Sequence, residues 1–378
     1  MTQKPLFFVL TVIGTAVLPL FLSGPHTLPV HAAAKAIPSQ PAVWNRQAAA
    51  SYLDSREVWW QSWDHAQKDH GTICVSCHTQ ASYALARPVL RGDLRETGPS
   101  ASEQVMLASI EKRVRGWKDM QPFYSDAVYG AGKEIQSRNA ESVLNAVILS
   151  SYDQRQGHMS ETTRMAFDNA WALQSKTGPD AGAWVWQNFD YTPWESKESQ
   201  YHWAALFAVS VAKAPDHYRS DPAIAANLSA LLAYLSSHYD AQPLLNKIVA
   251  LRAAARFPDL LNEAQRTALL GVIYTLQRPD GGWSLTDLGT WQRRDNTPLE
   301  TKPDGYATGI ITLALEENHI ANSQVQRGLS WLVDNQDPDT GAWPAWSLNK
   351  NRDPNSNVGK FMSDAATGYA VLALEARR

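Results

Sequence analysis

The sequence predicts an all-α protein in which six helix pairs close into an (α/α)6 toroid. Three observations lead to this fold class: a repeated loop rich in Gln, Gly and Trp, a helical periodicity that continues along the chain, and an Ala-rich second helix in each pair. Pairs of this kind bury their apolar faces only by stacking on their neighbours, and six of them close naturally into a ring.

The repeated loop is clearest in the C-terminal half. Residues 277–283 (QRPDGGW) are echoed by residues 336–343 (QDPDTGAW) and more loosely by residues 174–184. The tripeptide Ala-Thr-Gly follows the loops that start at Gln277 and Gln336 at the same distance, at 307–309 and at 366–368. Each unit is therefore predicted to be a helix, a Gly/Trp loop and a second helix.

Hydrophobic periodicity places the two helices of every pair. The first helices carry charge on one face, as at Glu111, Lys112 and Arg115, and are predicted to lie outside; the second helices are more apolar and are predicted to form the inner ring. The first helices are expected near residues 48–63, 102–117, 160–174, 222–238, 262–277 and 323–336, and the second near 74–90, 137–152, 197–213, 243–257, 304–317 and 362–376.

The N-terminus has the pattern of a cleaved secretory signal over residues 1–34. Lys4 precedes an apolar stretch, and small residues follow around Ala32. A periplasmic protein without a membrane span after cleavage is expected. The toroid is predicted over residues 45–378; the alternative is a separate cytochrome c-like module over 45–130 followed by a partial toroid over 131–378.

The charge balance excludes one class of partner. The chain has 34 Lys and Arg against 37 Asp and Glu, a formal net charge of −3. No basic patch is present that would indicate binding of nucleic acid or anionic lipid.

The two cysteines of the chain, Cys74 and Cys77, lie in the pentapeptide Cys-Val-Ser-Cys-His that ends at His78. This is the attachment signature of a c-type haem. Two thiols one helical turn apart can each add to a vinyl group of the porphyrin, which places His78 under the iron as the proximal ligand. One covalent haem is predicted, with a redox dithiol, a disulfide or a zinc site as alternatives.

The distal iron ligand is predicted less directly. Met120 stands close to a proline, as in many c-type cytochromes, and His202 lies on a predicted inner helix. Both residues also have an ordinary structural interpretation, Met120 as a gap-filling side chain and His202 as a core histidine.

The Gly/Trp loops resemble the QW motifs of the squalene-hopene cyclase and protein prenyltransferase superfamily. The resemblance rests on Gln174 with Trp184, Gln277 with Trp283, and Gln336 with Trp343. It implies an α/α toroid in which these side chains are structural staples. The aspartate-rich DxDD motif of the cyclases is missing from the sequence, and no cysteine outside residues 74–77 is available for the zinc of the prenyltransferases.

Polar residues at the starts of the inner helices are predicted to ring one mouth of the toroid, beneath the haem. The catalytic candidates are Asp304, Asp364 and His202. Asp304 and Asp364 can equally be helix caps. The candidates for lining the cavity are Tyr83, Arg138, Glu141, Trp203 and Tyr306, among which Arg138 and Glu141 have the spacing of an i,i+3 ion pair.

The leading functional prediction is a periplasmic haem protein that transfers electrons to a redox partner or carries out redox chemistry on a small apolar substrate. One alternative is a terpenoid cyclase-like enzyme, in which Asp304 or Asp364 needs a raised pKa. The other is a carbohydrate-active (α/α)6 enzyme, which fits the Trp-rich loops. A sealed apolar cavity favours the cyclase, and an aromatic groove with paired carboxylates favours the carbohydrate enzyme.

Overall fold

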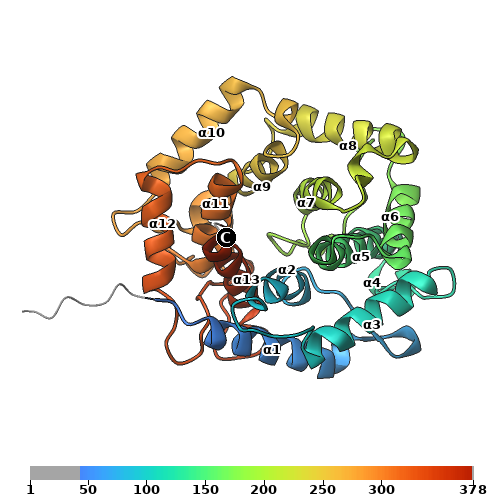
Figure 1. The fold of residues 1–378 in the computed structure, drawn as a ribbon, viewed down its shortest axis with the longest axis horizontal. Helices are drawn as coiled ribbons and strands as arrows, with labels where there is room; N and C mark the ends of the chain where they lie inside the picture. Colours follow the sequence, from blue (N-terminus) through green and yellow to red (C-terminus); the bar gives the residue numbers. More distant parts are fainter. Residues whose placement is uncertain (1–42, 377–378) are drawn as a thin grey trace, which may run out of the picture. The chain divides into compact units, whose positions relative to one another are not determined.

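The computed structural model describes residues 43–376, so the predicted signal peptide over 1–34 lies outside the described residues. Six outer helices surround six inner helices, and the two kinds alternate along the chain (Figure 1). The prediction of an (α/α)6 toroid is confirmed. The described part of the chain belongs to a single compact unit.

The helix boundaries follow the predicted pairs closely. The outer helices are α1 (Arg46–Ser62), α3 (Ala101–Arg115), α6 (Glu161–Leu173), α8 (Ala225–His238), α10 (Glu263–Leu276) and α12 (Ser323–Asp334). The inner helices are α2 (Gln80–Leu90), α5 (Lys133–Gln156), α7 (Ser199–Lys213), α9 (Leu244–Ala254), α11 (Gly305–Glu317) and α13 (Phe361–Glu375).

Short elements connect these helices. Two strands, β1 (Gln67–Lys68) and β2 (Thr72–Ile73), pair antiparallel between α1 and α2. The remaining elements are α4 (Asp126–Tyr129) and the 3₁₀ turns η1 (Asp64–Ala66), η2 (Asp69–Gly71), η3 (Tyr218–Ser220), η4 (Pro222–Ile224), η5 (Pro258–Leu260) and η6 (Leu285–Leu288).

One inner helix starts later than predicted. The periodicity places its start at residue 74, whereas α2 begins at Gln80. The Cys74 amide donates to Ala66 O at 2.8 Å, and Trp60 Nε1 donates to Cys74 O at 2.8 Å. These contacts continue the short hairpin and keep the segment extended, because they use backbone groups that a helical turn would need.

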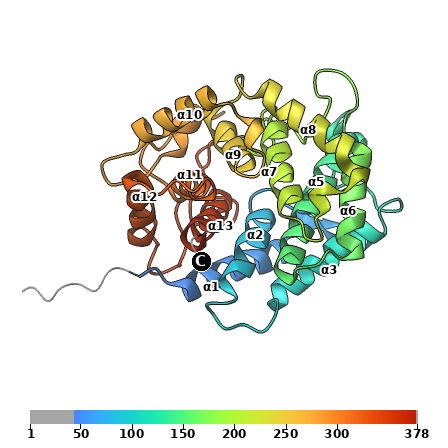
Figure 2. The ribbon, with the colours of Figure 1, turned by 45° about the horizontal axis from the view of Figure 1, so that its top comes forward.

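Small residues on the inner helices allow close packing. Every residue of α11 from Gly305 to Leu315 is buried, whereas α10 buries only Leu269 and Ile273. A Cβ atom on Gly309 would lie 2.7 Å from the Ala370 amide nitrogen of α13. The two inner helices therefore touch through backbone, and α13 in turn packs on α2, as Figure 2 shows.

The Gln and Trp side chains of the repeated loops hold neighbouring outer helices together. Gln277 Nε2 donates to Gly281 O within its own loop and to Gln324 O of α12, both at 2.8 Å, and Trp283 Nε1 donates to Ile273 O at 2.8 Å. Gln174 and Trp184 repeat this pattern between α6 and α8. The loops are thus structural staples.

The third loop closes the ring. Gln336 Nε2 donates to Gly341 O and to Asn45 O, both at 2.9 Å, and the Asn45 amide donates back to Gln336 Oε1 at 2.6 Å. Asn45 caps the start of α1 by accepting from the Ala48 amide. The first outer helix therefore stands where the helix after α12 would stand, which joins the two ends of the described chain.

A glycine with positive φ is essential to each staple. Gly281 has a φ of 97°, and a Cβ atom there would lie 2.6 Å from Arg327 O of α12. Gly182 and Gly341 make the same close approach to α8 and α1. We expect Gly281→Ala to lower the free energy of unfolding by at least about 2 kcal/mol, because alanine adds both backbone strain and a clash.

The control for this substitution is Gly271→Ala in the outer helix α10. No neighbouring atom lies within 4 Å of a Cβ placed at Gly271. This change should raise the free energy of unfolding by about 0.5–1 kcal/mol, since alanine favours the helix. Denaturant unfolding measures both variants, and equal effects of the two substitutions would contradict the staple.

Candidate active site

A pocket of about 200 Å³ opens between the end of α1, the start of α13 and the loops that precede α7 and α13. Its walls combine aromatic rings with a few polar side chains. The lining residues are Trp60, Trp63, His78, Tyr124, Tyr191, Thr192, Trp194, Glu195, Ser347, Asn349, Arg352, Val358, Gly359, Phe361 and Met362.

Two loops that are distant in sequence build one side of this pocket together. Asn349 Nδ2 donates to Thr192 O at 2.9 Å, which ties the loop before α13 to the loop before α7. The guanidinium of Arg56 donates to Asn357 Oδ1 at 2.9 Å and to Asn357 O at 2.7 Å. Arg56 is buried, so the loop that carries Arg352 is anchored from inside the protein.

Aromatic rings pack around His78 at the floor of the pocket. Its imidazole is stacked on Phe361, with ring centroids 3.8 Å apart. Trp60 meets the imidazole edge-on at 5.3 Å, and Trp194 lies 6.0 Å away. Trp63 extends this wall, with its ring 5.4 Å from Trp60.

Hydrogen bonds determine which nitrogen of the neutral His78 ring carries the proton. Thr79 Oγ1 donates to Asp364 Oδ2 at 2.6 Å, while Asp364 Oδ1 also accepts from Tyr52 OH at 2.8 Å and from Arg56 Nε at 2.7 Å. His78 Nδ1 lies 2.9 Å from Thr79 Oγ1. The single proton of the Thr79 hydroxyl is used in the hydrogen bond to Asp364, so the hydroxyl oxygen can only accept from His78. His78 Nδ1 must therefore carry a proton and donate it in this hydrogen bond. The lone pair of the neutral ring is therefore on Nε2.

Burial keeps this imidazole neutral. Burial, together with the positive charges of Arg56 and Arg352, lowers the pKa of His78 to about 3. At neutral pH the ring is therefore a hydrogen-bond acceptor through Nε2.

Glu195 is the one carboxylate among the lining residues. Burial raises its pKa to about 7, against the opposing effect of the positive charge of Lys133. The side chain is only partly covered because it faces the pocket. Among the described residues Arg352 makes no ion pair, so its charge is available in the same pocket. The pocket thus offers a proton-transfer group, a cation and a neutral acceptor.

No protein-family model matches the sequence, and no match is found among the curated proteins. Solved structures are similar to this chain, and the first of them shares its fold. An α-1,6-mannanase of Salegentibacter sp. HEL1_6, in complex with α-1,6-mannotriose, has 11% identity and a TM-score of 0.50, with 88% of this chain and 99% of that chain covered. A polysaccharide lyase matches with 15% identity and a TM-score of 0.46, over 88% and 97% of the two chains.

These comparisons correct the predicted family. The resemblance to the squalene-hopene cyclases and prenyltransferases is wrong, because no family model supports it and the structures found with this toroid include a mannanase. The staples of Gln174, Gln277 and Gln336 are nevertheless present. They stabilise the ring without identifying the family.

The prediction of a c-type haem is also wrong. Within residues 43–376 no group of three or more His, Cys, Asp and Glu side chains is placed to hold a metal ion, and the structure that shares the fold is named for carbohydrate chemistry. The two cysteines are not on a helical turn, and Cys74 is 5% exposed. Burial raises the pKa of Cys74 to about 12, and Phe361 covers one face of His78.

The cytochrome features that depended on the haem are corrected with it. His78 instead lines the aromatic pocket. Met120, the first candidate for the distal ligand, is buried against Gly116. Neither Met120 nor His202, the second candidate, lines that pocket.

The three predicted catalytic residues lie in different surroundings. Asp304 caps α11 by accepting from the amides of Ala307 at 2.8 Å and Leu285 at 2.6 Å; burial raises its pKa to about 7. His202 is buried in α7 and burial lowers its pKa to about 4, although the amide of Asn246 opposes this. Asp364 is connected to the pocket through Thr79, and none of the three lines it.

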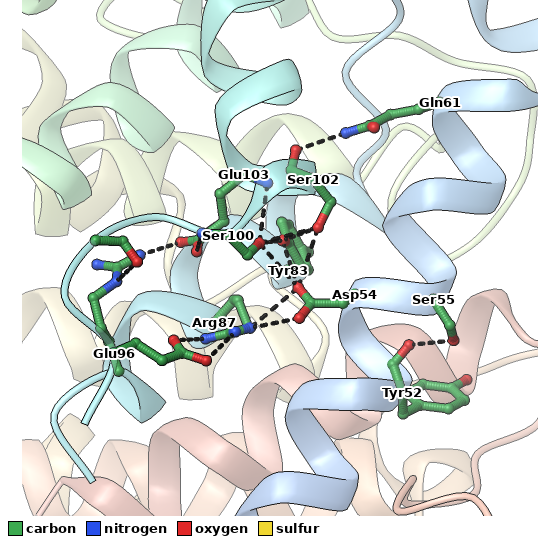
Figure 3. Close-up of polar contacts among 12 residues, drawn as sticks. Tyr52, Asp54, Ser55, Gln61, Tyr83, Arg87, Glu96, Ser100, Ser102 and Glu103 are labelled. Atoms are coloured by element: carbon green, nitrogen blue, oxygen red, sulfur yellow. Dashed lines mark hydrogen bonds and ion pairs between the residues drawn. The ribbon is translucent and has the colours of Figure 1, made fainter. Parts of the chain in front are cut away.

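The predicted cavity-lining residues are dispersed. Tyr83 donates to Asp54 in a polar cluster of α1, α2 and α3 that also holds Arg87 (Figure 3). Trp203 stacks on Trp186 at 5.3 Å. Tyr306 accepts from Trp194 Nε1 at 3.2 Å and so supports the pocket from behind.

Arg138 and Glu141 form the i,i+3 ion pair that their spacing predicts, but the pair is long. Glu141 binds Arg113 Nε at 2.5 Å, whereas its distance to Arg138 Nη1 is 3.9 Å. Arg138 lies over the ring of Trp117.

Sequence reasoning missed Glu195, Arg352 and Phe361. The abundance of tryptophan in loops was the available signal, since Trp194 directly precedes Glu195. The loops of Thr192 and Asn349 meet at the pocket, and a hydrogen bond joins these two residues across 157 positions of sequence. Nothing in the local sequence indicates this contact.

The raised pKa of Glu195 predicts a pH-dependent stability. The folded protein holds this proton more tightly than the unfolded chain, so the contribution is present below pH 4.5 and is lost as the pH rises through about 7. We expect the wild type to lose about 1–2 kcal/mol more than Glu195→Gln between pH 5 and pH 8, because a partly covered carboxylate keeps some hydration.

Urea unfolding across this pH range measures the difference. Asp304 and Glu57 also have pKa values raised to about 7, but they are common to both proteins and cancel. Glu198→Gln, an exposed change on the same segment, is the control and should follow the wild type. Parallel profiles for the wild type and Glu195→Gln would contradict the assignment.

Proposed function

We propose that this chain is a carbohydrate-active enzyme that binds an acidic saccharide in the aromatic pocket and cleaves it by elimination. The observation that carries the proposal is that Glu195, whose pKa is about 7, and Arg352, which makes no ion pair with another described residue, both line one pocket walled by aromatic rings. The mannanase shows that this fold also occurs in a carbohydrate-active enzyme, and its similarity to this chain is limited to the fold.

The walls of the pocket suit a sugar ring. A pyranose has apolar C–H faces and polar hydroxyl edges, so it fits a pocket that combines aromatic rings with a few placed polar groups. Trp63, Tyr191 and Phe361 supply rings, and Asn349 and His78 Nε2 supply hydrogen-bonding groups. A carboxylate on the sugar would receive charge-assisted hydrogen bonds from Arg352.

The polar groups favour elimination over hydrolysis. Glycoside hydrolysis ordinarily uses two carboxylates, and Glu195 is the one carboxylate that lines this pocket. In an elimination, ionised Glu195 removes the proton from the carbon next to the substrate carboxylate. The electron pair of the broken C–H bond forms a C=C bond as the C–O bond to the leaving sugar breaks. The Glu195 carboxyl then returns its proton to the departing oxygen.

The electrostatics of the pocket support both halves of this step. A pKa near 7 gives a carboxyl group that accepts and donates a proton with similar ease at neutral pH. Arg352 stabilises the negative charge that develops on the substrate carboxylate. Neutral His78 adds no competing positive charge.

Export is part of the proposal. The predicted signal at residues 1–34 would deliver the enzyme to the periplasm. Among the described residues, no helix is both long enough and apolar enough to cross a membrane.

Binding should depend on Arg352. We expect Arg352→Gln to weaken binding of a uronate oligosaccharide about 10- to 100-fold, because a charge-assisted hydrogen bond contributes about 1.5–3 kcal/mol. Isothermal titration calorimetry measures this, with a neutral mannan oligosaccharide for comparison. Lys350→Gln, an exposed cation two residues away, should bind like the wild type; equal losses in both variants would count against the site.

Cleavage should depend on Glu195. We expect Glu195→Gln to reduce formation of the unsaturated product at least about 100-fold while changing affinity less than about threefold, because the amide cannot transfer the proton. Ultraviolet absorbance of the unsaturated uronate measures the reaction. Release of reducing sugar without that absorbance would show hydrolysis and overturn the elimination.

A further inference from the structure

A second cavity, of about 110 Å³, lies toward the C-terminal ends of the inner helices. Helices α2, α5, α7, α9 and α13 contribute to its walls. It shares no lining residue with the aromatic pocket, which lies at the starts of α2 and α13. The proposed function leaves this cavity without a role.

The charged residues that line the second cavity are all cations. They are Arg155, Lys213 and Arg252, and no acidic residue lines it. The counter-charge of Lys213 and Arg252 is Glu317, which accepts from Lys213 Nζ at 2.6 Å and from Arg252 Nε at 2.7 Å. One carboxylate is therefore shared between two cations, and the positive charge is in excess.

Arg252 is the strongest sign of a missing partner. The residue is 5% exposed, and its Nη1 atom has no hydrogen-bond partner among the described residues. A buried guanidinium nitrogen left without an acceptor is costly, and buried polar groups in folded proteins are nearly always paired. Glu317 is engaged by the Nε side of the guanidinium.

The side chains of Lys213 and Arg155 complete the set. Lys213 has three protons on its ammonium group, of which Glu317 accepts one. Arg155 is exposed at the edge of the cavity, and no ion pair ties it to another described residue. A buried donor, a half-buried donor and a donor at the edge thus surround one small space.

We propose that this cavity binds a small oxyanion, such as a phosphate, sulfate or carboxylate group, between Arg252, Lys213 and Arg155. The size of the cavity restricts the ligand to one compact group, either a free ion or the charged end of a larger molecule. The inference does not depend on the proposed saccharide chemistry.

The helix ends provide a competing explanation for the cations. The C-terminal ends of several helices gather here, and their partial negative charge favours Lys and Arg. That effect accounts for an excess of positive side chains. The helix ends do not account for the Nη1 atom of Arg252, which still lacks a hydrogen-bond acceptor among the described residues. An oxyanion in the cavity would supply that acceptor.

Titration of the full chain at low ionic strength tests the site with three probes: inorganic phosphate, sulfate and acetate. We expect one anion per chain to bind in this cavity, apart from any anion that Arg352 holds in the aromatic pocket, and we expect its affinity to fall about tenfold or more in Arg155→Gln and in Lys213→Gln. Binding of phosphate or sulfate supports a tetrahedral oxyanion, and binding of acetate alone supports a carboxylate. Arg352→Gln should remove anion binding in the aromatic pocket and leave the binding in this cavity unchanged.

Two variants keep the test decisive. Lys213→Gln removes a partner of Glu317 and can lower stability, whereas Arg155→Gln removes an exposed side chain, so its fold should persist by circular dichroism. Failure of all three anions to bind, or binding that neither variant weakens, overturns the proposal. A loss of saccharide cleavage in Arg352→Gln alone concerns the proposed function and leaves this site untouched.

Discussion

The contact between the last repeated loop and the first outer helix is the constraint on which the remaining structure depends. Gln336 binds the backbone of Asn45, and Gly341 lies against the backbone of Ala48. An inner helix buries its face only when helices stand on both sides of it. Closure supplies the missing neighbour, and it also brings α13 against α2, where a Cβ on Gly368 would lie 2.8 Å from the Cβ of Ser82.

The aromatic pocket is a consequence of this closure. His78 and Thr79 precede α2, while Asp364 and Phe361 belong to α13, so the hydrogen bond of Thr79 to Asp364 spans 285 residues of sequence. The buried carboxylate of Asp364 also accepts hydrogen bonds from Arg56 and Tyr52 of α1. A charge buried in this way is tolerated because every oxygen is paired. The orientation of His78 therefore depends on helices from both ends of the described chain.

The sequence predicts the repeating architecture better than the site. Periodicity and the Gln/Trp loops place the six pairs, because both signals are local and recur. The start of α2 escapes prediction, since Trp60 and Ala66 hold Cys74 through contacts that periodicity does not encode. The Cys-x-x-Cys-His motif correctly directs attention to His78 but wrongly to haem. Glu195 and Arg352 come to line one pocket only through the fold.

The most direct test of the account is a crystal structure of the Glu195→Gln protein soaked with a uronate oligosaccharide, which binds without being cleaved. The account predicts a sugar ring against the aromatic wall formed by Trp63 and Phe361, with its carboxylate on Arg352 and the proton of its neighbouring carbon directed at residue 195. A sugar bound elsewhere on the toroid, or with its carboxylate directed away from Arg352, would contradict the account.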